Sequence, residues 1–137
     1  MHSAEHILNQ TMVRKFGCKR SFSNHIERKK SKCDYKFERP ISDDEIIDIE
    51  GKVNVILQQK LDITEEFLSY SEAVENFNLG KIPDEDSERI RIIKIGDYDA
   101  CPCIGAHVKN TSEIGTFKIT TSSFENGVLR IRYKLIK

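Results

Sequence analysis

The sequence lacks an excess of charge of either sign, and this absence bears on the partners that it can have. Its 22 lysines and arginines balance 22 aspartates and glutamates, so the formal net charge at pH 7 is zero. Proteins that attract nucleic acid through their overall charge are strongly basic. The neutral net charge therefore argues against binding of nucleic acid by bulk attraction, whereas it does not exclude a local basic face.

Long apolar runs, a cysteine framework and repeats are also missing. No apolar stretch approaches the ~20 residues that cross a bilayer, and the polar first residues show no signal-peptide core. The four cysteines follow no disulfide-scaffold spacing, which favours a reducing cytoplasm. A length of 137 residues suits one domain with one core. We therefore expect a cytoplasmic protein without membrane contact, with a single domain over residues 1–137.

Two pairs of metal-capable side chains share the same i,i+4 spacing. One pair is His2 and His6, and the other is Cys103 and His107. Either pair alone is weak evidence, since two histidines can meet on a polar helix by chance and cysteine is a common core residue. Together they supply three imidazoles and a thiolate, which suit tetrahedral Zn²⁺. The sequence therefore predicts a zinc ion shared between segments near the two ends of the chain.

Hydrophobic periodicity and turn signals divide the chain into helices and strands. We predict helices over residues 2–15, 43–60 and 71–77, strands over 21–26, 33–37, 63–68, 88–95, 116–124 and 128–136, and an exposed loop over 81–87. Ser42 and Glu45 form a capping box at the start of the second helix. Asn126-Gly127 predicts a tight hairpin. The expected fold is α+β, a mainly antiparallel sheet packed against the long second helix.

The first two predicted strands are joined by a basic segment. Arg28, Lys29, Lys30 and Lys32 lie in this connection. Such a cluster is either an ordinary solvated turn or a contact surface for RNA phosphates. Both interpretations remain open from the sequence.

Two motifs resemble a known family. Residues 2–8, His-Ser-Ala-Glu-His-Ile-Leu, resemble the H-T-A-x-H-[ILV] opening of alanyl-tRNA editing domains. Residues 103–119, CIGAHVKNTSEIGTFKI, resemble their C-G-G-T-H-V-x-x-T-G-E-I-G-x-F-K-I segment. The family is the second additional domain of threonyl- and alanyl-tRNA synthetases, with its freestanding AlaX-type relatives. The resemblance covers almost the entire chain, and the sequence looks like a short AlaX-type protein.

The resemblance implies a metal site, an activity and a partner. Its pattern assigns zinc to His2, His6, Cys103 and His107, and leaves Cys101 as a spare thiol because no histidine stands four residues after it. The family hydrolyses the ester of tRNA that carries a wrong amino acid. The expected substrate is therefore mischarged, alanine-accepting tRNA bearing serine or glycine.

The resemblance also implies a hydroxyl residue on the strand after the first helix, close to the seryl group. Ser21 is the first candidate and Ser23 the second, and the alternative is that both are ordinary strand serines. Ile104 and Ala106 depart from the family pattern, which has Gly and Thr there. The longer relatives have an extra domain ahead of the H-x-x-x-H helix that we expect to be absent here, together with its tRNA-binding surface.

Two functions from different classes fit these observations. The first is a zinc-dependent, trans-acting aminoacyl-tRNA deacylase, which requires an open pocket beside the metal. The second is a non-catalytic module with a structural zinc that binds RNA or protein, which predicts a closed metal site.

Overall fold

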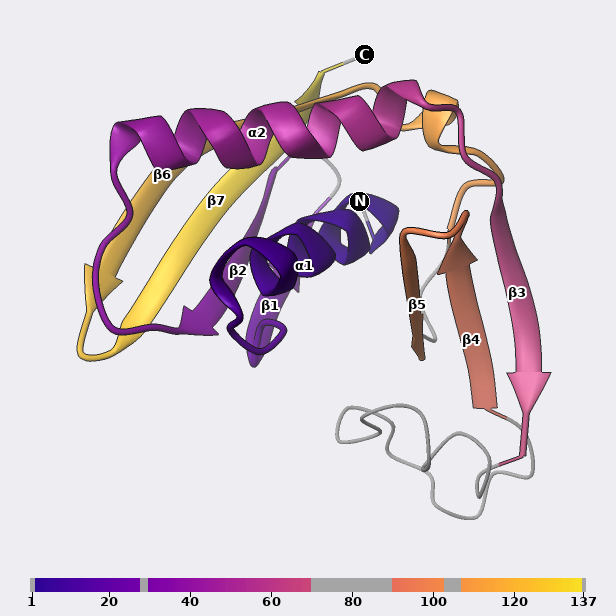
Figure 1. Cartoon of the computed structure of the whole chain (residues 1–137), viewed down its shortest axis with the longest axis horizontal. Coiled ribbons are helices and arrows are strands. Elements are labelled where there is room, and N and C mark those ends of the chain that lie inside the picture. The colour runs from indigo at the N-terminus through magenta and orange to yellow at the C-terminus, as the bar shows by residue number, and fades with distance from the viewer. Residues whose placement is uncertain (1, 28–29, 70–89, 103–106, 137) are drawn as a thin grey trace.

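The computed structural model describes residues 2–27, 30–69, 90–102 and 107–136, with the backbone alone at His2 (Figure 1). In chain order the elements are α1 (His2–Phe16), β1 (Ser23–Ile26), β2 (Lys30–Lys36), α2 (Asp43–Gln58), β3 (Ile63–Leu68), β4 (Ile90–Ile95), β5 (Asp99–Pro102), the 3-10 turn η1 (Thr111–Glu113), β6 (Thr116–Glu125) and β7 (Val128–Ile136). The fold is α+β, with two helices and antiparallel sheets. None of the described helices is long and apolar enough to cross a bilayer.

The larger sheet has the strand order β1-β2-β7-β6, and all its pairs are antiparallel. Its β6 edge is covered by α2, whose side chains bind the backbone of this strand. Asn54 exchanges two hydrogen bonds with Phe117, at 2.9 and 2.8 Å, and Glu50 accepts from the N–H of Ile119 at 2.8 Å. Satisfying an edge strand in this way prevents it from pairing with another chain.

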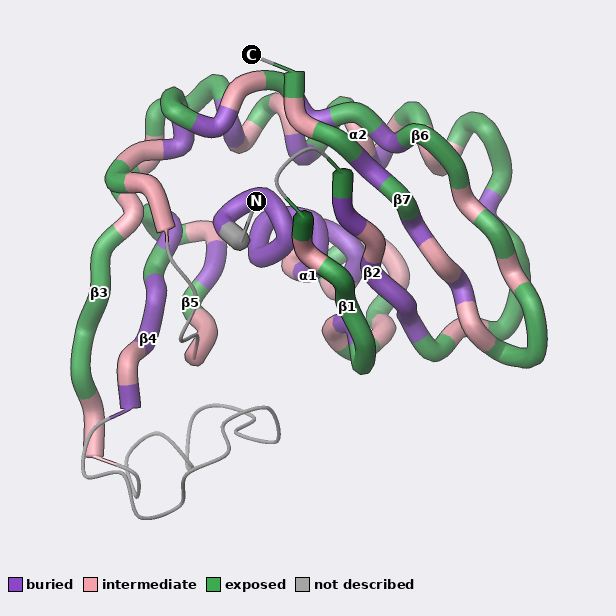
Figure 2. The backbone as a smooth tube through the Cα atoms, turned by 180° about the vertical axis from the view of Figure 1, so that it is seen from behind, coloured by how far each residue is buried: buried purple, intermediate pink, exposed green. Residues whose placement is uncertain are grey.

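A second sheet contains β3, β4 and β5 in that order. The sequence predicted one sheet, whereas the structure has two, with α1 between them (Figures 1 and 2). Helix α1 is fastened to the turn before β5 through Tyr98. The carbonyl oxygen of Tyr98 accepts from Gln10 and Arg14, each at 2.9 Å, and its hydroxyl lies 2.6 Å from that of Thr11.

The main core forms where α1 and α2 meet the inner face of the larger sheet. Its buried members include Ala4, Ile7, Leu8 and Met12 of α1, Ile49, Val53 and Leu57 of α2, and Leu129, Ile131 and Tyr133 of β7. Full burial of one such side chain stabilises the fold by about 1.5–3 kcal/mol. The core therefore fixes α1, and with it the first metal-like motif, against the sheet.

Several predictions that depend on neighbouring residues are confirmed. The capping box is complete at Ser42 and Glu45. Asn126 and Gly127 have φ values of 51° and 78°, as a tight hairpin between β6 and β7 requires. The strand over residues 63–68 is confirmed at both ends. The predicted helix over 71–77 and loop over 81–87 lie outside the described residues.

The first hairpin differs from its prediction at both strands. β2 begins at Lys30, inside the predicted basic turn, because it pairs with β7 along its whole length, from Lys30 opposite Lys134 to Lys36 opposite Val128. β1 begins at Ser23 rather than at Ser21. The N–H of Ser21 instead donates to the side chain of Asn9 at 2.9 Å, so a helix side chain replaces the sheet partner.

Candidate active site

The structure brings His6 and His107 together from the two motifs. Their rings meet edge to face, with centroids 4.8 Å apart and planes at 72°. His6 lies in the first half of α1 and is 2% exposed, while His107 follows β5. The side chain of His2 and all of Cys103 lie outside the described residues. Half of the predicted ligand set is therefore placed, and the two placed side chains are neighbours.

Each of these histidines has an oxygen beside its Nδ1 atom. Nδ1 of His107 lies 2.8 Å from the hydroxyl of Ser3, in the first turn of α1. Nδ1 of His6 lies 3.5 Å from Oδ2 of Asp99, at the start of β5. A hydrogen bond at one ring nitrogen fixes the orientation and tautomer of an imidazole and leaves the other nitrogen for a metal, and Ser3 is placed to do this at His107. The described half of the donor set therefore fits a shared zinc ion.

Asp99 is in turn held by Arg20. The guanidinium donates to both carboxylate oxygens, at 2.9 and 3.4 Å. Burial by itself raises the pKa of Asp99, but the contacts with His6 and Arg20 outweigh it, and the net pKa lies below its usual value. Asp99 therefore remains a carboxylate although it is buried, and His6 faces a fixed negative charge.

A polar cluster occupies the other side of His6. Oε2 of Glu5 lies 3.7 Å from its Nε2, and Oε1 of Glu5 accepts from Asn9 at 2.7 Å and from Asn24 at 2.9 Å. Asn24 also reaches Oγ of Ser21 at 3.3 Å, and Ser21 is 2% exposed. Ser21 is thus linked to the neighbourhood of His6 through two amide side chains and one carboxylate.

The second serine candidate and the spare thiol lie elsewhere. Ser23 is exposed on β1. Cys101 is partly exposed, and its thiol donates to the carbonyl of Pro102 at 3.4 Å. These positions do not contradict the prediction that Ser23 is the second hydroxyl candidate and Cys101 a spare thiol. The role of Ser21 in recognising the seryl group stays a prediction.

Four residues around His6 were not predicted from the sequence. They are Glu5, Asn9, Arg20 and Asp99. Glu5 and Asn9 carry a weak signal, because they stand at i,i+4 spacing on either side of His6 in the predicted helix; the structure shows that both are buried. Arg20 and Asp99 carry none, since only the fold brings them together.

The remainder of the second motif has a structural role that explains its polar residues. Thr111 is fully buried, donates to the carbonyl of Leu57 at 3.0 Å and accepts from the N–H of Leu61 at 2.9 Å. The side chain of Asn110 donates to the carbonyl of Lys60 at 2.9 Å. These contacts tie the segment after His107 to the end of α2, while His107 itself contacts α1 through Ser3.

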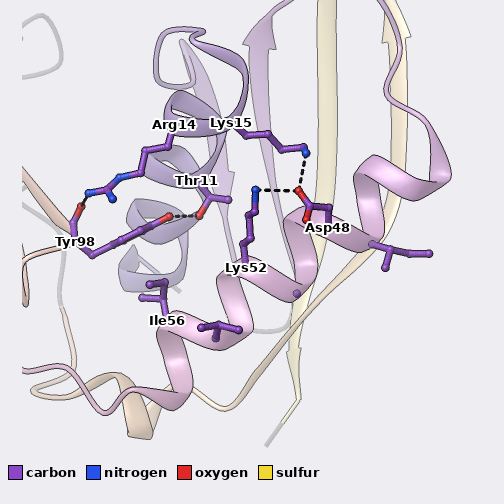
Figure 3. A pocket seen from close by; sticks show the side chains of 10 residues that line it. Thr11, Arg14, Lys15, Asp48, Lys52, Ile56 and Tyr98 are labelled. Atoms are coloured by element: carbon purple, nitrogen blue, oxygen red, sulfur yellow. Dashed lines mark hydrogen bonds and ion pairs between the residues drawn. The ribbon is translucent and has the colours of Figure 1, made fainter.

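A groove of about 600 Å³ runs between α1 and α2 (Figure 3). Thr11, Arg14 and Tyr98 line one side, and Asp48 and Ile56 lie across from them. Neither His6 nor His107, the two predicted ligands whose side chains the structure describes, lines this groove. Within the part of the chain that the structure describes, no group of three or more His, Cys, Asp or Glu side chains is arranged to hold a metal ion.

Comparison with known proteins defines the class of domain. Residues 90–132 match the model of the threonyl and alanyl tRNA synthetase second additional domain. The chain is 33% identical over 132 residues to the alanine–tRNA ligase of Fervidobacterium nodosum, and 33% identical over 132 residues to that of Caldicellulosiruptor saccharolyticus. It is 31% identical over 139 residues to the enzyme of Aeropyrum pernix.

These alignments cover 95%, 95% and 96% of this chain but only 15% of each ligase. The chain thus spans a small part of the length of the relatives that it matches. It carries a second additional domain of the threonyl- and alanyl-tRNA synthetase family, as its two motifs indicated.

Proposed function

We propose that this domain is a zinc-dependent hydrolase that removes the amino acid from mischarged, alanine-accepting tRNA, with serine as the main substrate and glycine as the second. The observation that carries the proposal is the meeting of His6 and His107, with ring centroids 4.8 Å apart, from two motifs at opposite ends of the chain. The relation to alanine–tRNA ligases supports tRNA as the partner. His2, His6, Cys103 and His107 would hold the metal, and bound zinc would polarise the ester carbonyl, activate a water or hold the α-amino group of the substrate.

The surrounding side chains would position this site. Asp99, whose Oδ2 lies 3.5 Å from Nδ1 of His6, would help to orient this imidazole, and Arg20 holds Asp99 through two hydrogen bonds. Ser3 performs the same orienting role at His107. Residues that orient metal ligands typically change metal affinity or activity by about 10–100-fold when they are replaced.

The polar cluster beside His6 provides a means to select serine. Seryl and alanyl esters differ by one hydroxyl group. A buried polar group that pairs with this hydroxyl is left unpaired by alanine, which costs about 1–3 kcal/mol. Ser21, Asn24 and Glu5 already form a hydrogen-bonded cluster of suitable chemistry.

The test follows release of radiolabelled amino acid from seryl-, glycyl- and alanyl-tRNA(Ala), with the zinc-loaded protein and with an EDTA-treated sample. We expect serine and glycine to be released and alanine to be spared. His6→Ala should abolish turnover, whereas Cys101→Ala should retain it. Circular dichroism checks that both variants are folded.

Equal rates with and without zinc would refute the metal-dependent mechanism. Failure to hydrolyse any of the three esters, by zinc-loaded protein, would refute the deacylase and favour a non-catalytic RNA-binding module.

A further inference from the structure

The larger sheet has one face that no described helix covers. Residues of β7 alternate between the two faces, with Leu129, Ile131 and Tyr133 pointing into the core. Both helices pack on that inner side, because their buried side chains belong to the same core (Figures 1 and 2). Arg132 and Lys134 therefore point to the outer face, and both are exposed.

The outer face is strongly basic although the chain as a whole is neutral. We define the basic face as the outward-pointing cations of β2, β6 and β7: Lys30, Lys32, Lys36, Lys118, Arg130, Arg132 and Lys134. Asp34 pairs with Arg130 at 2.8 and 3.0 Å. Among the described residues, none of the other six cations has a carboxylate within 4.0 Å. Six cations thus project from this face without a described salt bridge, while Asp34, Glu125 and, in the hollow described below, Glu27 are its described carboxylates.

The register places like charges directly opposite each other. Lys30 stands opposite Lys134, Lys32 opposite Arg132, and Lys118 opposite Lys134. Like charges in directly opposed positions destabilise a sheet. An anion that bridges these pairs would reverse the effect. A hollow of about 130 Å³, lined by Lys30, Lys32, Arg132, Thr120, Ser31, His25 and Glu27, lies at this end of the face.

The residue types on this face indicate which kind of partner it binds. The outward residues of β2, β6 and β7 include no Phe, Tyr or Trp, and an exposed aromatic ring, that of Phe22, lies at the margin of the face beside Lys36. Stacking on aromatic rings is the usual means of binding unpaired bases, and an apolar or aromatic centre is the usual mark of a protein interface. Lysines and arginines spread over three neighbouring strands instead suit contacts with the phosphates of a double-helical stem.

We propose that the basic face binds the phosphate backbone of a double-helical RNA stem. The inference rests on the proposed function, since it assigns a second contact surface to the same tRNA. It places the stem on the outer side of the sheet, while His6 and His107 on the inner side would receive the ester. Binding at this face is independent of sequence, so selection of the amino acid and attachment of the stem are separate tasks of one domain.

The experiment measures the affinity of the full chain for uncharged tRNA(Ala) transcript between about 50 and 200 mM salt, the range over which phosphate binding weakens steeply. The test variant is Lys32→Gln/Arg132→Gln/Lys134→Gln. The control variant, Lys52→Gln/Lys60→Gln/Lys94→Gln, removes the same charge from α2, the turn after it and β4.

The test variant should bind more weakly than wild type. Its plot of log affinity against log salt should be flatter by about 0.7–0.9 for each phosphate that the protein no longer neutralises. The control should keep the wild-type slope. The melting temperature of the test variant should equal or exceed that of wild type, because opposed cations have been removed.

Two outcomes would overturn the proposal. One is an unchanged salt slope in the test variant, which would leave the face to an acidic protein partner or to solvent. The other is an equal weakening of tRNA binding in both variants, which would show an effect of bulk charge.

A substrate without a double-helical stem allows the stem-binding proposal and the proposed deacylase function to be tested independently. Serine esterified to a short single-stranded 3′-terminal oligonucleotide reports on the His6 site alone. The test variant should hydrolyse it at the wild-type rate while binding the full tRNA weakly. If wild type binds tRNA through this face but hydrolyses neither substrate, the stem-binding surface stands and the deacylase does not.

Discussion

Asp99 and Arg20 form a two-point ion pair in which both carboxylate oxygens accept from the guanidinium, at 2.9 and 3.4 Å. The side chain of Asp99 is 1% exposed and that of Arg20 is 30% exposed. The same carboxylate faces Nδ1 of His6. The pair therefore connects the loop after α1, the start of β5 and one of the two placed histidines.

We expect Asp99→Asn to weaken zinc binding by about 10–100-fold, as is typical when an outer partner of a metal ligand is replaced. The neutral amide removes the negative charge that faces Nδ1 of His6, so the imidazole loses a charged neighbour that would help to orient it. Arg20 also loses its partner, so the melting temperature should fall. Zinc titration against a competing chelator measures the first effect. Asp97→Asn, an exposed change two residues away, is the control and should alter neither quantity.

The second prediction concerns the choice between two neighbouring thiols. Cys103→Ala and His107→Ala should each lower zinc content and melting temperature, because metal binding free energy adds to folding free energy. Cys101→Ala should leave both close to wild type. Elemental analysis of purified variants decides the matter, and zinc retained in Cys103→Ala but absent from Cys101→Ala would reverse the ligand assignment.

Local features of the fold were predictable, because their partners lie within a few residues. The capping box needs only Ser42 and Glu45, and the hairpin needs only Asn126 and Gly127. The strand limits of the first hairpin were not predictable. Asn9 on α1 takes the N–H of Ser21, and pairing with β7 extends β2 to Lys30, so tertiary partners set both limits.

The residues of the candidate site likewise fall into two groups, those that a local sequence pattern predicted and those that only the tertiary fold brings together. His6 and His107 were found because each belongs to an i,i+4 pair that is visible in the sequence. Arg20 and Asp99 stand 79 positions apart and have no pattern of their own. Their contact depends on the second sheet, which places the start of β5 beside α1, and no local signal predicts that packing.

The third prediction concerns how the stability of the fold depends on pH in the acid range, through the carboxyl group of Glu45. Arg39 and the backbone N–H of Ser42 lower the pKa of Glu45 to about 2, from an ordinary value of 4.5. A carboxyl group with a lowered pKa in the folded state stabilises the fold above its ordinary pKa, and this stabilisation disappears as the pH falls. It should therefore disappear between pH 4.5 and about pH 2.

Glu45→Gln should melt below wild type near neutral pH, and the difference should shrink towards pH 2, the value to which the pKa is lowered. Melting curves at closely spaced pH steps measure this convergence. Glu38→Gln removes the same charge from an exposed neighbour and is the control. A constant gap between Glu45→Gln and wild type across the whole range would show that the charge of Glu45 contributes nothing to stability.

The last prediction tests whether Ser21 selects the substrate. Ser21 is buried, and its hydroxyl lies in the cluster that connects Asn24 and Glu5 with His6. If this hydroxyl recognises the seryl group, Ser21→Ala removes one hydrogen bond that alanine never made. The cost of about 1–3 kcal/mol should then fall on the seryl ester alone.

The measurement compares kcat/KM for seryl- and alanyl-tRNA(Ala) in wild type, Ser21→Ala and Ser23→Ala. Ser21→Ala should narrow the preference for serine by roughly 5–150-fold, the ratio that 1–3 kcal/mol represents, while hydrolysis of the alanyl ester stays near its wild-type rate. Ser23→Ala is a matched control, because the exposed hydroxyl on β1 lies outside the cluster. If Ser21→Ala slows both esters equally, Ser21 supports the packing around His6 and does not read the substrate.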